Sequence, residues 1–116
     1  MNPEVSPYLV EGARLLAEGD YFMAHETLEE HWIDAPESER DLLQALIHVA
    51  VGLLHHEKGN LKGAGLQFRK ARRRIEGYPQ THETVDLEAV RDFLAGAENN
   101  LDGGVTLTPP PVLKDR

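Results

Sequence analysis

A histidine and a glutamate in segment 22–32 have the residue types and the spacing that could support chemistry. The segment reads FMAHETLEEHW. At 100° per residue, His25, Leu28, Glu29 and Trp32 fall on one side of a helix, and Leu28 and Trp32 predict that this side packs inward. A histidine and a glutamate there must be paired, bound to a ligand or open to water, because an unpaired buried charge is costly. Glu26, next to His25, joins these candidates.

A second polar set lies on the next segment, which is otherwise apolar over residues 42–54. Gln44, His48 and His55 lie within about 40° of one another on a helix. We expect this narrow polar line to face the helix of His25 and Glu29. The two sets would then form a polar cluster of His, Glu and Gln between the second and third helices.

One interpretation of this cluster is a metal site. His25 and Glu29 at i, i+4 can bind one ion, and Gln44 or His48 could complete the set. His48 and His55 are about 10 Å apart along a helix, too far to share an ion readily. The metal-ligand candidates are therefore His25, Glu29 and His48. A metal-dependent, hydrolase-like enzyme centred on His25 and Glu29 is the alternative function, and the sequence names no catalytic residue.

The preferred interpretation is a buried polar network that fixes helix register. In it, Glu29 accepts hydrogen bonds from His25, from His55 or from the indole of Trp32. The third interpretation is a ligand groove lined by the same residues. With a buried network or a ligand groove, the protein would be a small helical binding or assembly module. Neither interpretation needs a cofactor, whereas a metal-dependent enzyme needs a divalent metal ion.

Basic residues are concentrated in one part of the chain. Seven of the twelve Lys and Arg residues lie between Lys58 and Arg74. The first interpretation is a solvated helix end, where cations are favourable to the helix dipole, paired with Glu26, Glu30 or other surface acids. The alternative is an anionic partner such as RNA or a phosphorylated ligand. The net charge of −8 argues against nucleic acid.

Composition sets the remaining limits on function. A chain of 116 residues suggests one domain, and the absence of cysteine excludes disulfides, a cysteine nucleophile and thiolate zinc sites. Neither a secretory signal nor an apolar segment of membrane-spanning length is visible, so we expect a cytoplasmic protein. The expected partner is a small ligand or another protein, with a homo-oligomer as an open alternative, and not nucleic acid or a membrane.

Five helices are predicted from capping residues, breakers and helical periodicity. Their approximate ranges are 7–18, 21–33, 37–57 or 38–57, 61–76 and 87–101, since Ser38 or Glu37 opens the third helix. Ser6, Asp20, Asn60 and Asp86 are the expected N-caps. We expect Ala17 to face inward in the first helix and Leu101 in the fifth. The predicted organisation is a single helical domain over residues 1–101 and an irregular C-terminal tail over 102–116.

An internal repeat with a spacing of 40 residues indicates how these helices are arranged. Gly19-Asp20 recurs as Gly59-Asn60, and Ala24 recurs as Ala64. This pattern resembles the turn and second helix of a tetratricopeptide hairpin. The predicted fold is therefore all-α, a five-helix bundle of two stacked tetratricopeptide-like hairpins plus a closing helix.

Three motifs over residues 19–65 carry a family resemblance. They are Ala24-His25-Glu26 with Leu28, Glu29 and Trp32; Gln44 with Leu46, Ile47 and Ala50; and His55 before Gly59, Asn60, Gly63 and Ala64. Together they resemble domain-of-unknown-function family three-hundred-nine, whose middle motif usually carries Gln where this chain has His48. The resemblance implies an all-helical fold and no established activity.

Overall fold

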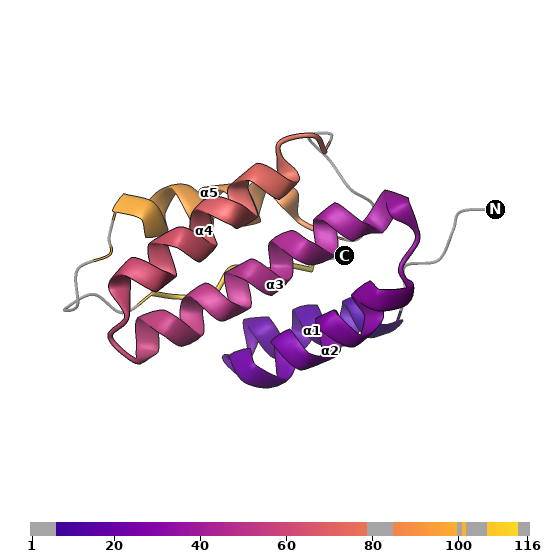
Figure 1. Ribbon diagram of the computed structural model, residues 1–116, viewed down its shortest axis with the longest axis horizontal. Helices are drawn as coiled ribbons and strands as arrows, with labels where there is room; N and C mark the ends of the chain where they lie inside the picture. The colour runs from indigo at the N-terminus through magenta and orange to yellow at the C-terminus, as the bar shows by residue number, and fades with distance from the viewer. Residues whose placement is uncertain (1–6, 79–84, 100, 102–106, 114–116) are drawn as a thin grey trace.

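The computed structural model describes residues 7–78, 85–99, 101 and 107–113, and it places five α-helices in them (Figure 1). The helices are α1 (Pro7–Ala17), α2 (Tyr21–Asp34), α3 (Glu37–Glu57), α4 (Leu61–Ile75) and α5 (Leu87–Asn99). No extended strand occurs in the described part of the chain, so the predicted all-α class is confirmed. None of these helices is both long enough and apolar enough to cross a membrane.

The long helix α3 is the centre of the bundle. It packs against α2 on one side and α4 on the other, and α2 and α4 do not contact each other. Figure 1 shows α1 behind α2 and α5 behind α4, in agreement with the contacts between these pairs. The three helices α2, α3 and α4 therefore form one layer, which α1 and α5 cover from behind.

The two turns of the internal repeat have the same conformation. Gly19 and Gly59 have positive φ angles of 91° and 79°, which favour glycine at a helix C-terminus. The side chains of Asp20 and Asn60 then cap the next helices, accepting hydrogen bonds from the backbone N–H groups of Met23 and Gly63 at 3.3 and 3.0 Å. In both halves, the chain therefore reverses direction through a glycine with positive φ followed by an N-capping side chain.

The largest share of the core comes from α3, and the inner sides of the neighbouring helices supply the rest of its helical part. Leu42, Leu46 and Val49 are fully buried. On α4, Phe68 is also fully buried and meets Phe93 of α5 edge to face, with ring centroids 5.5 Å apart. This aromatic contact joins the predicted closing helix to the rest of the core.

Three details differ from the prediction or lie outside the described residues. Ala17 was expected to face inward but is exposed, because α1 ends at this residue. Leu101 was expected in the fifth helix, but α5 ends at Asn99 and Leu101 is half-buried beyond it. The predicted cap Ser6 lies outside the described residues, whereas Asp86 caps α5 by accepting from the backbone N–H of Ala89 at 3.0 Å.

Residues 107–113 form no helix, yet they pack against the bundle. This segment, yellow in Figure 1, passes behind α3. The side chain of Val112 is fully buried, and its carbonyl oxygen accepts a hydrogen bond of 2.7 Å from the backbone N–H of Asp86. The segment therefore contributes to the core. The predicted domain boundary at residue 101 stays a prediction.

Candidate functional site

His25 and Glu29 form a pair on the surface of α2. His25 Nε2 lies 2.6 Å from Glu29 Oε2, and the two side chains are 26% and 51% exposed. The predicted buried network is therefore wrong, since no polar or charged residue in the described part of the chain is buried as a whole. The physical reason is a shift of the buried side of α2, which is defined by Tyr21, Ala24 and Leu28 and leaves His25 and Glu29 at its border.

The polar line of α3 makes contacts away from this pair. His48 Nδ1 lies 2.7 Å from Oε1 of Gln67 on α4, and His55 Nδ1 lies 3.4 Å from Nδ2 of Asn60. Gln44 lines a groove shared with α4. Within the described ranges, no hydrogen bond or ion pair joins this line to His25, Glu26 or Glu29. The predicted polar cluster between α2 and α3 is therefore not formed, because α4 supplies the partner of His48.

Trp32 fixes the passage from α2 to α3. The guanidinium of Arg40 lies 4.5 Å from the centroid of the Trp32 ring, and Arg40 Nη1 donates a hydrogen bond of 3.5 Å to the Trp32 carbonyl. The indole Nε1 is buried and has no acceptor among the residues that the structure describes. The expected hydrogen bond from this indole to Glu29 is therefore absent there, and Trp32 serves the helix junction.

A groove of about 720 Å³ lies between α3 and the C-terminal half of α4. We call it the α3–α4 groove. Its lining residues are Asp41, Gln44, His48, Lys70, Arg73, Arg74, Gly77 and Tyr78. One wall is supplied by α3 and is mainly neutral, the other is supplied by α4 and is basic, and Gly77 and Tyr78 follow the end of α4.

Tyr78 is held by the first turns of α3. Its hydroxyl donates a hydrogen bond of 2.7 Å to the Ser38 carbonyl and accepts one of 3.1 Å from the backbone N–H of Leu42. Burial raises the pKa of the Tyr78 hydroxyl above its usual value, so this group stays neutral. Tyr78 therefore fixes the chain after α4 against α3 and sets the width of the groove.

His48 is the histidine of the groove, and it is neutral at pH 7. Burial lowers the pKa of the His48 ring, the hydrogen bond that His48 Nδ1 donates to Gln67 Oε1 opposes that effect, and the nearby cations Lys70 and Arg74 lower the pKa further. The ring therefore provides hydrogen bonds rather than charge. The positive charge of the groove comes from α4.

The cations of α4 are only partly compensated within the chain. Arg74 Nη1 lies 3.2 Å from Asp41 of α3, and Arg72 Nη1 lies 3.5 Å from Glu98 of α5. Lys62, Arg69, Lys70 and Arg73 form no ion pair with any residue in the described part of the chain, and all four are exposed. Arg69, Arg72 and Arg73 are all exposed, which agrees with the solvated helix end predicted from the sequence.

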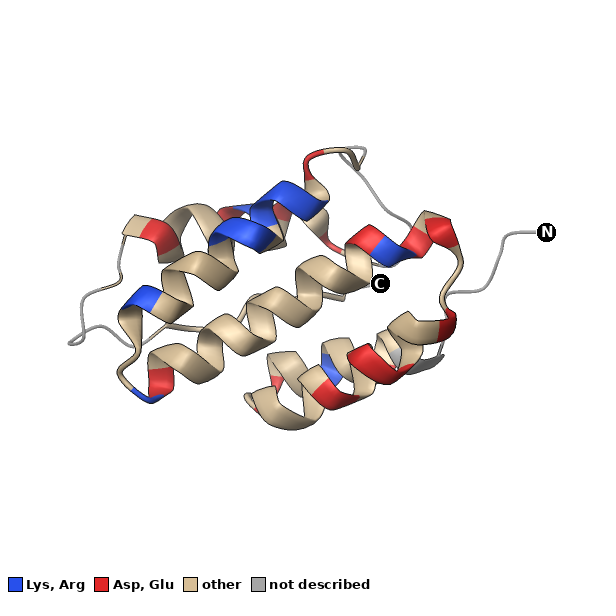
Figure 2. Cartoon of the chain, in the orientation of Figure 1, with Lys and Arg blue, Asp and Glu red and all other residues tan. Residues whose placement is uncertain are grey.

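Two of these cations pair with surface acids, as predicted, but in the described part of the chain the partners are Asp41 and Glu98 and not Glu26 or Glu30. Figure 2 shows Lys and Arg along α4, Asp and Glu along α2, and the largely uncharged middle of α3 between them. Because α2 and α4 do not contact each other, the acids of α2 cannot reach the cations of α4 within one molecule. The charged surfaces of the two helices stay apart.

Of the eight residues that line the groove, only Gln44 and His48 were among the predicted site residues, and Gln67, which contacts His48 beside the groove, was not predicted either. Gln67 orients His48, and Tyr78 closes the groove. Gln67 stands next to Phe68 at the border of the buried side of α4, a position from which a polar side chain can reach α3. That signal alone does not identify its partner. In the sequence, Tyr78 stands between a glycine and a proline, a combination that predicts only the end of a helix.

Known proteins similar to this chain support the family assignment. A family model described as a domain of unknown function (DUF309) matches residues 9–66. The chain belongs to this family. The family resemblance seen in the motifs is thereby confirmed, and the match includes α2, α3 and the first part of α4.

The uncharacterized protein YpuF of Bacillus subtilis (strain 168) is 34% identical over 82 residues. The match covers 70% of this chain and 45% of YpuF, so the chain spans less than half the length of this curated relative. Neither the family model nor YpuF carries a described activity. The function therefore has to be argued from the site.

Proposed function

We propose that this protein is a small helical binding module and that its α3–α4 groove binds an anionic group, a carboxylate or a phosphate, of a ligand or partner. The observation that carries this proposal is the basic wall of the groove, where Lys70, Arg73 and Arg74 line about 720 Å³. Only Arg74 among them has an acidic partner in the described chain. A cytoplasmic location belongs to the same proposal.

The chemistry of the two walls supports this assignment. Guanidinium groups match the geometry of carboxylates and phosphates, and Lys70 adds a compact positive charge. The opposite wall carries Gln44 and the neutral ring of His48, which can hydrogen-bond the polar part of a ligand. The groove is open to water, so charge attraction there is weakened by salt.

Isothermal titration calorimetry at low salt tests this proposal with two probes, tripolyphosphate and hexaglutamate. We expect at least one probe to bind, and the comparison between them tells phosphate from carboxylate recognition. The double variant Lys70→Gln/Arg74→Gln should weaken binding about tenfold or more, because it removes two charges from the basic wall. The matched control Lys58→Gln/Lys62→Gln also removes two positive charges, but near the N-terminus of α4 and away from the groove.

The control decides between a site and a general charge effect. Binding that is kept in Lys58→Gln/Lys62→Gln and lost in Lys70→Gln/Arg74→Gln supports the groove. Equal weakening in both variants, or no heat of binding with either probe, contradicts the proposal.

The second candidate function is the metal-dependent enzyme centred on His25 and Glu29. His25, Glu26 and Glu29 can each offer one ligand atom within 4.8 Å of the others, which favours it. His48 is not part of this group, since its ring contacts Gln67. Elemental analysis of protein purified without a histidine tag separates the two candidates. A stoichiometric metal ion that is lost in Glu29→Ala supports the enzyme.

A further inference from the structure

The internal repeat reverses charge between its two halves. Residues 40 positions apart occupy equivalent places in α2 and α4, because both helices begin after the same glycine turn. At three of these equivalent places the sign of charge changes, from Glu29 to Arg69, from Glu30 to Lys70 and from Asp34 to Arg74. One helix of the layer is therefore acidic, and its counterpart is basic.

The exposed sides of the two helices also carry apolar side chains. On α2, Phe22, Glu26 and Ile33 share one side of the helix, and Phe22 and Ile33 are 56% and 65% exposed. The equivalent residues on α4 are Lys62, Leu66 and Arg73, and Leu66 is 45% exposed. In the described part of the chain, α2 thus presents several large apolar side chains among acidic residues, and α4 presents one, Leu66, among basic residues. This combination is typical of a surface that binds another protein.

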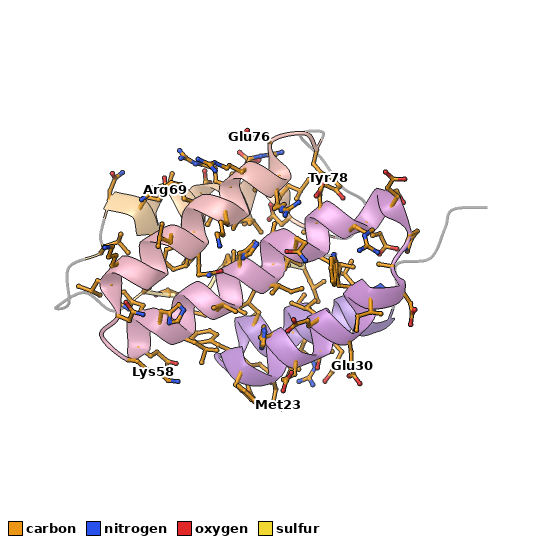
Figure 3. All side chains as sticks on the ribbon, viewed as in Figure 1. Met23, Glu30, Lys58, Arg69, Glu76 and Tyr78 are labelled. Carbon is orange, nitrogen blue, oxygen red and sulfur yellow. The ribbon has the colours of Figure 1, made fainter. Side chains whose placement is uncertain are left out.

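These complementary surfaces lie on opposite edges of one molecule. Glu30 lies on the side of α2 away from α3, and Arg69 lies on the side of α4 away from α3 (Figure 3). Glu26 and Glu30 form no ion pair within the described part of the chain, nor do Arg69 and Lys70. The charges that complement each other can therefore meet only between two molecules.

We call Lys62, Leu66, Arg69, Lys70 and Arg73 the basic α4 surface, and Phe22, Glu26, Glu30 and Ile33 the acidic α2 surface. We propose that the partner of the basic α4 surface is the acidic α2 surface of a second copy of this chain. The inference rests on the proposed function and deepens it, because the basic α4 surface shares Lys70 and Arg73 with the α3–α4 groove and α2 of the second copy supplies the carboxylates. The two helices have 14 and 15 residues, so both are about 21 Å long and can lie along each other. Because the two surfaces differ, association is head to tail, which gives rings or open chains of molecules.

Self-association should be concentration-dependent and should weaken with salt. The screening length falls from about 10 Å at 0.1 M to about 3 Å at 1 M, so exposed charges attract much less at high salt. Sedimentation velocity over a range of protein concentrations measures this directly. We expect species larger than the monomer at about 0.1 M NaCl and a shift toward monomer at about 1 M.

Charge reversal and its rescue provide the decisive test. Glu26→Lys/Glu30→Lys makes α2 basic, and Arg69→Glu/Arg73→Glu makes α4 acidic, so each variant alone should associate about tenfold or more weakly than the natural chain. Mixing the two variants should restore association, because the basic α2 of one then meets the acidic α4 of the other. The matched control is Glu88→Lys/Asp92→Lys, which reverses two exposed acids on α5.

Circular dichroism melts of all variants establish that each is folded before its mass is compared. A chain that stays monomeric at low salt and high concentration overturns the inference, as does association that both reversals leave unchanged. Failure to restore association on mixing also overturns it. If the α3–α4 groove still binds tripolyphosphate or hexaglutamate in a purely monomeric protein, the proposed function stands and only the identity of the partner is wrong.

Discussion

Glu29 illustrates how exposure limits the energy of an ion pair. Its contact with His25 is short, but both side chains reach water, and exposed pairs contribute about 0–1 kcal/mol. We expect Glu29→Ala to lower the free energy of unfolding by no more than this range. Urea unfolding measures the change, and Glu26→Ala on the same helix corrects for helix propensity. A loss above about 3 kcal/mol would instead indicate a buried pair.

His48 should make stability depend on pH. Its pKa is lower in the folded protein, because burial disfavours the charged ring, than in the unfolded chain, where histidine titrates near about 6.5. Below that pH the unfolded state binds more protons, so the free energy of unfolding falls as pH falls and levels off below the folded pKa. Urea unfolding between about pH 7.5 and 5 should show a smaller fall in His48→Gln than in the natural chain. Equal slopes would contradict this prediction.

At the residue scale, the sequence predicted the contact between His25 and Glu29 but not the contact between His48 and Gln67. The pairing of His25 with Glu29 follows from their i, i+4 spacing on one helix, and the structure confirms it. The partner of His48 did not follow, because α3 is apolar over most of its circumference. The direction of its polar line relative to α2 and α4 depends on how three helices pack together.

The packing between α3 and α4 depends on a glycine without a side chain at one point. A Cβ added to Gly52 would lie 2.5 Å from the ring of Phe68, which is fully buried and has little freedom to move. We expect Gly52→Ala to destabilise the protein by about 1–3 kcal/mol through overpacking, although alanine is the better helix former. Thermal unfolding followed by circular dichroism measures the effect.

Gly96 on α5 is the control for this substitution. A Cβ added there meets no atom of the described residues within 4 Å, apart from its own helix backbone and chain neighbours, so Gly96→Ala should stabilise the protein by about 0.5–1 kcal/mol through helix propensity. If both substitutions stabilise the protein equally, the close approach of α3 and α4 at Gly52 is wrong.

At the element scale, the helices were largely predictable because local signals mark their ends. Glycine turns and the caps Asp20, Asn60 and Asp86 predicted where α2, α4 and α5 begin. The packed segment 107–113 was not predicted, because its proline-rich sequence carries no periodicity. Its place in the core involves a hydrogen bond between Val112 and Asp86, two residues that are far apart in the sequence.

At the scale of the whole molecule, the distribution of charge matters more than its total. Six Lys and Arg residues lie on α4, while the chain as a whole carries a net charge of −8. We expect no binding of single-stranded RNA, because a polymer of phosphates extends beyond the basic groove over a surface that is acidic overall. Fluorescence anisotropy with a labelled oligomer at low salt tests this. A salt-sensitive signal lost in Arg72→Glu/Arg73→Glu, but kept in the control Arg14→Glu, would make α4 a nucleic-acid surface.

The contact of segment 107–113 with Asp86 has a consequence for the order in which the protein folds. Each helix packs on the helix that follows it in sequence, so α1 to α4 can assemble as they leave the ribosome, and such local contacts favour rapid folding. Val112 cannot fill its place in the core until the chain has been synthesised well beyond α5. The nascent bundle therefore exposes an apolar gap behind α3 until translation passes this residue, and a chaperone that binds apolar surface has its opportunity in that interval.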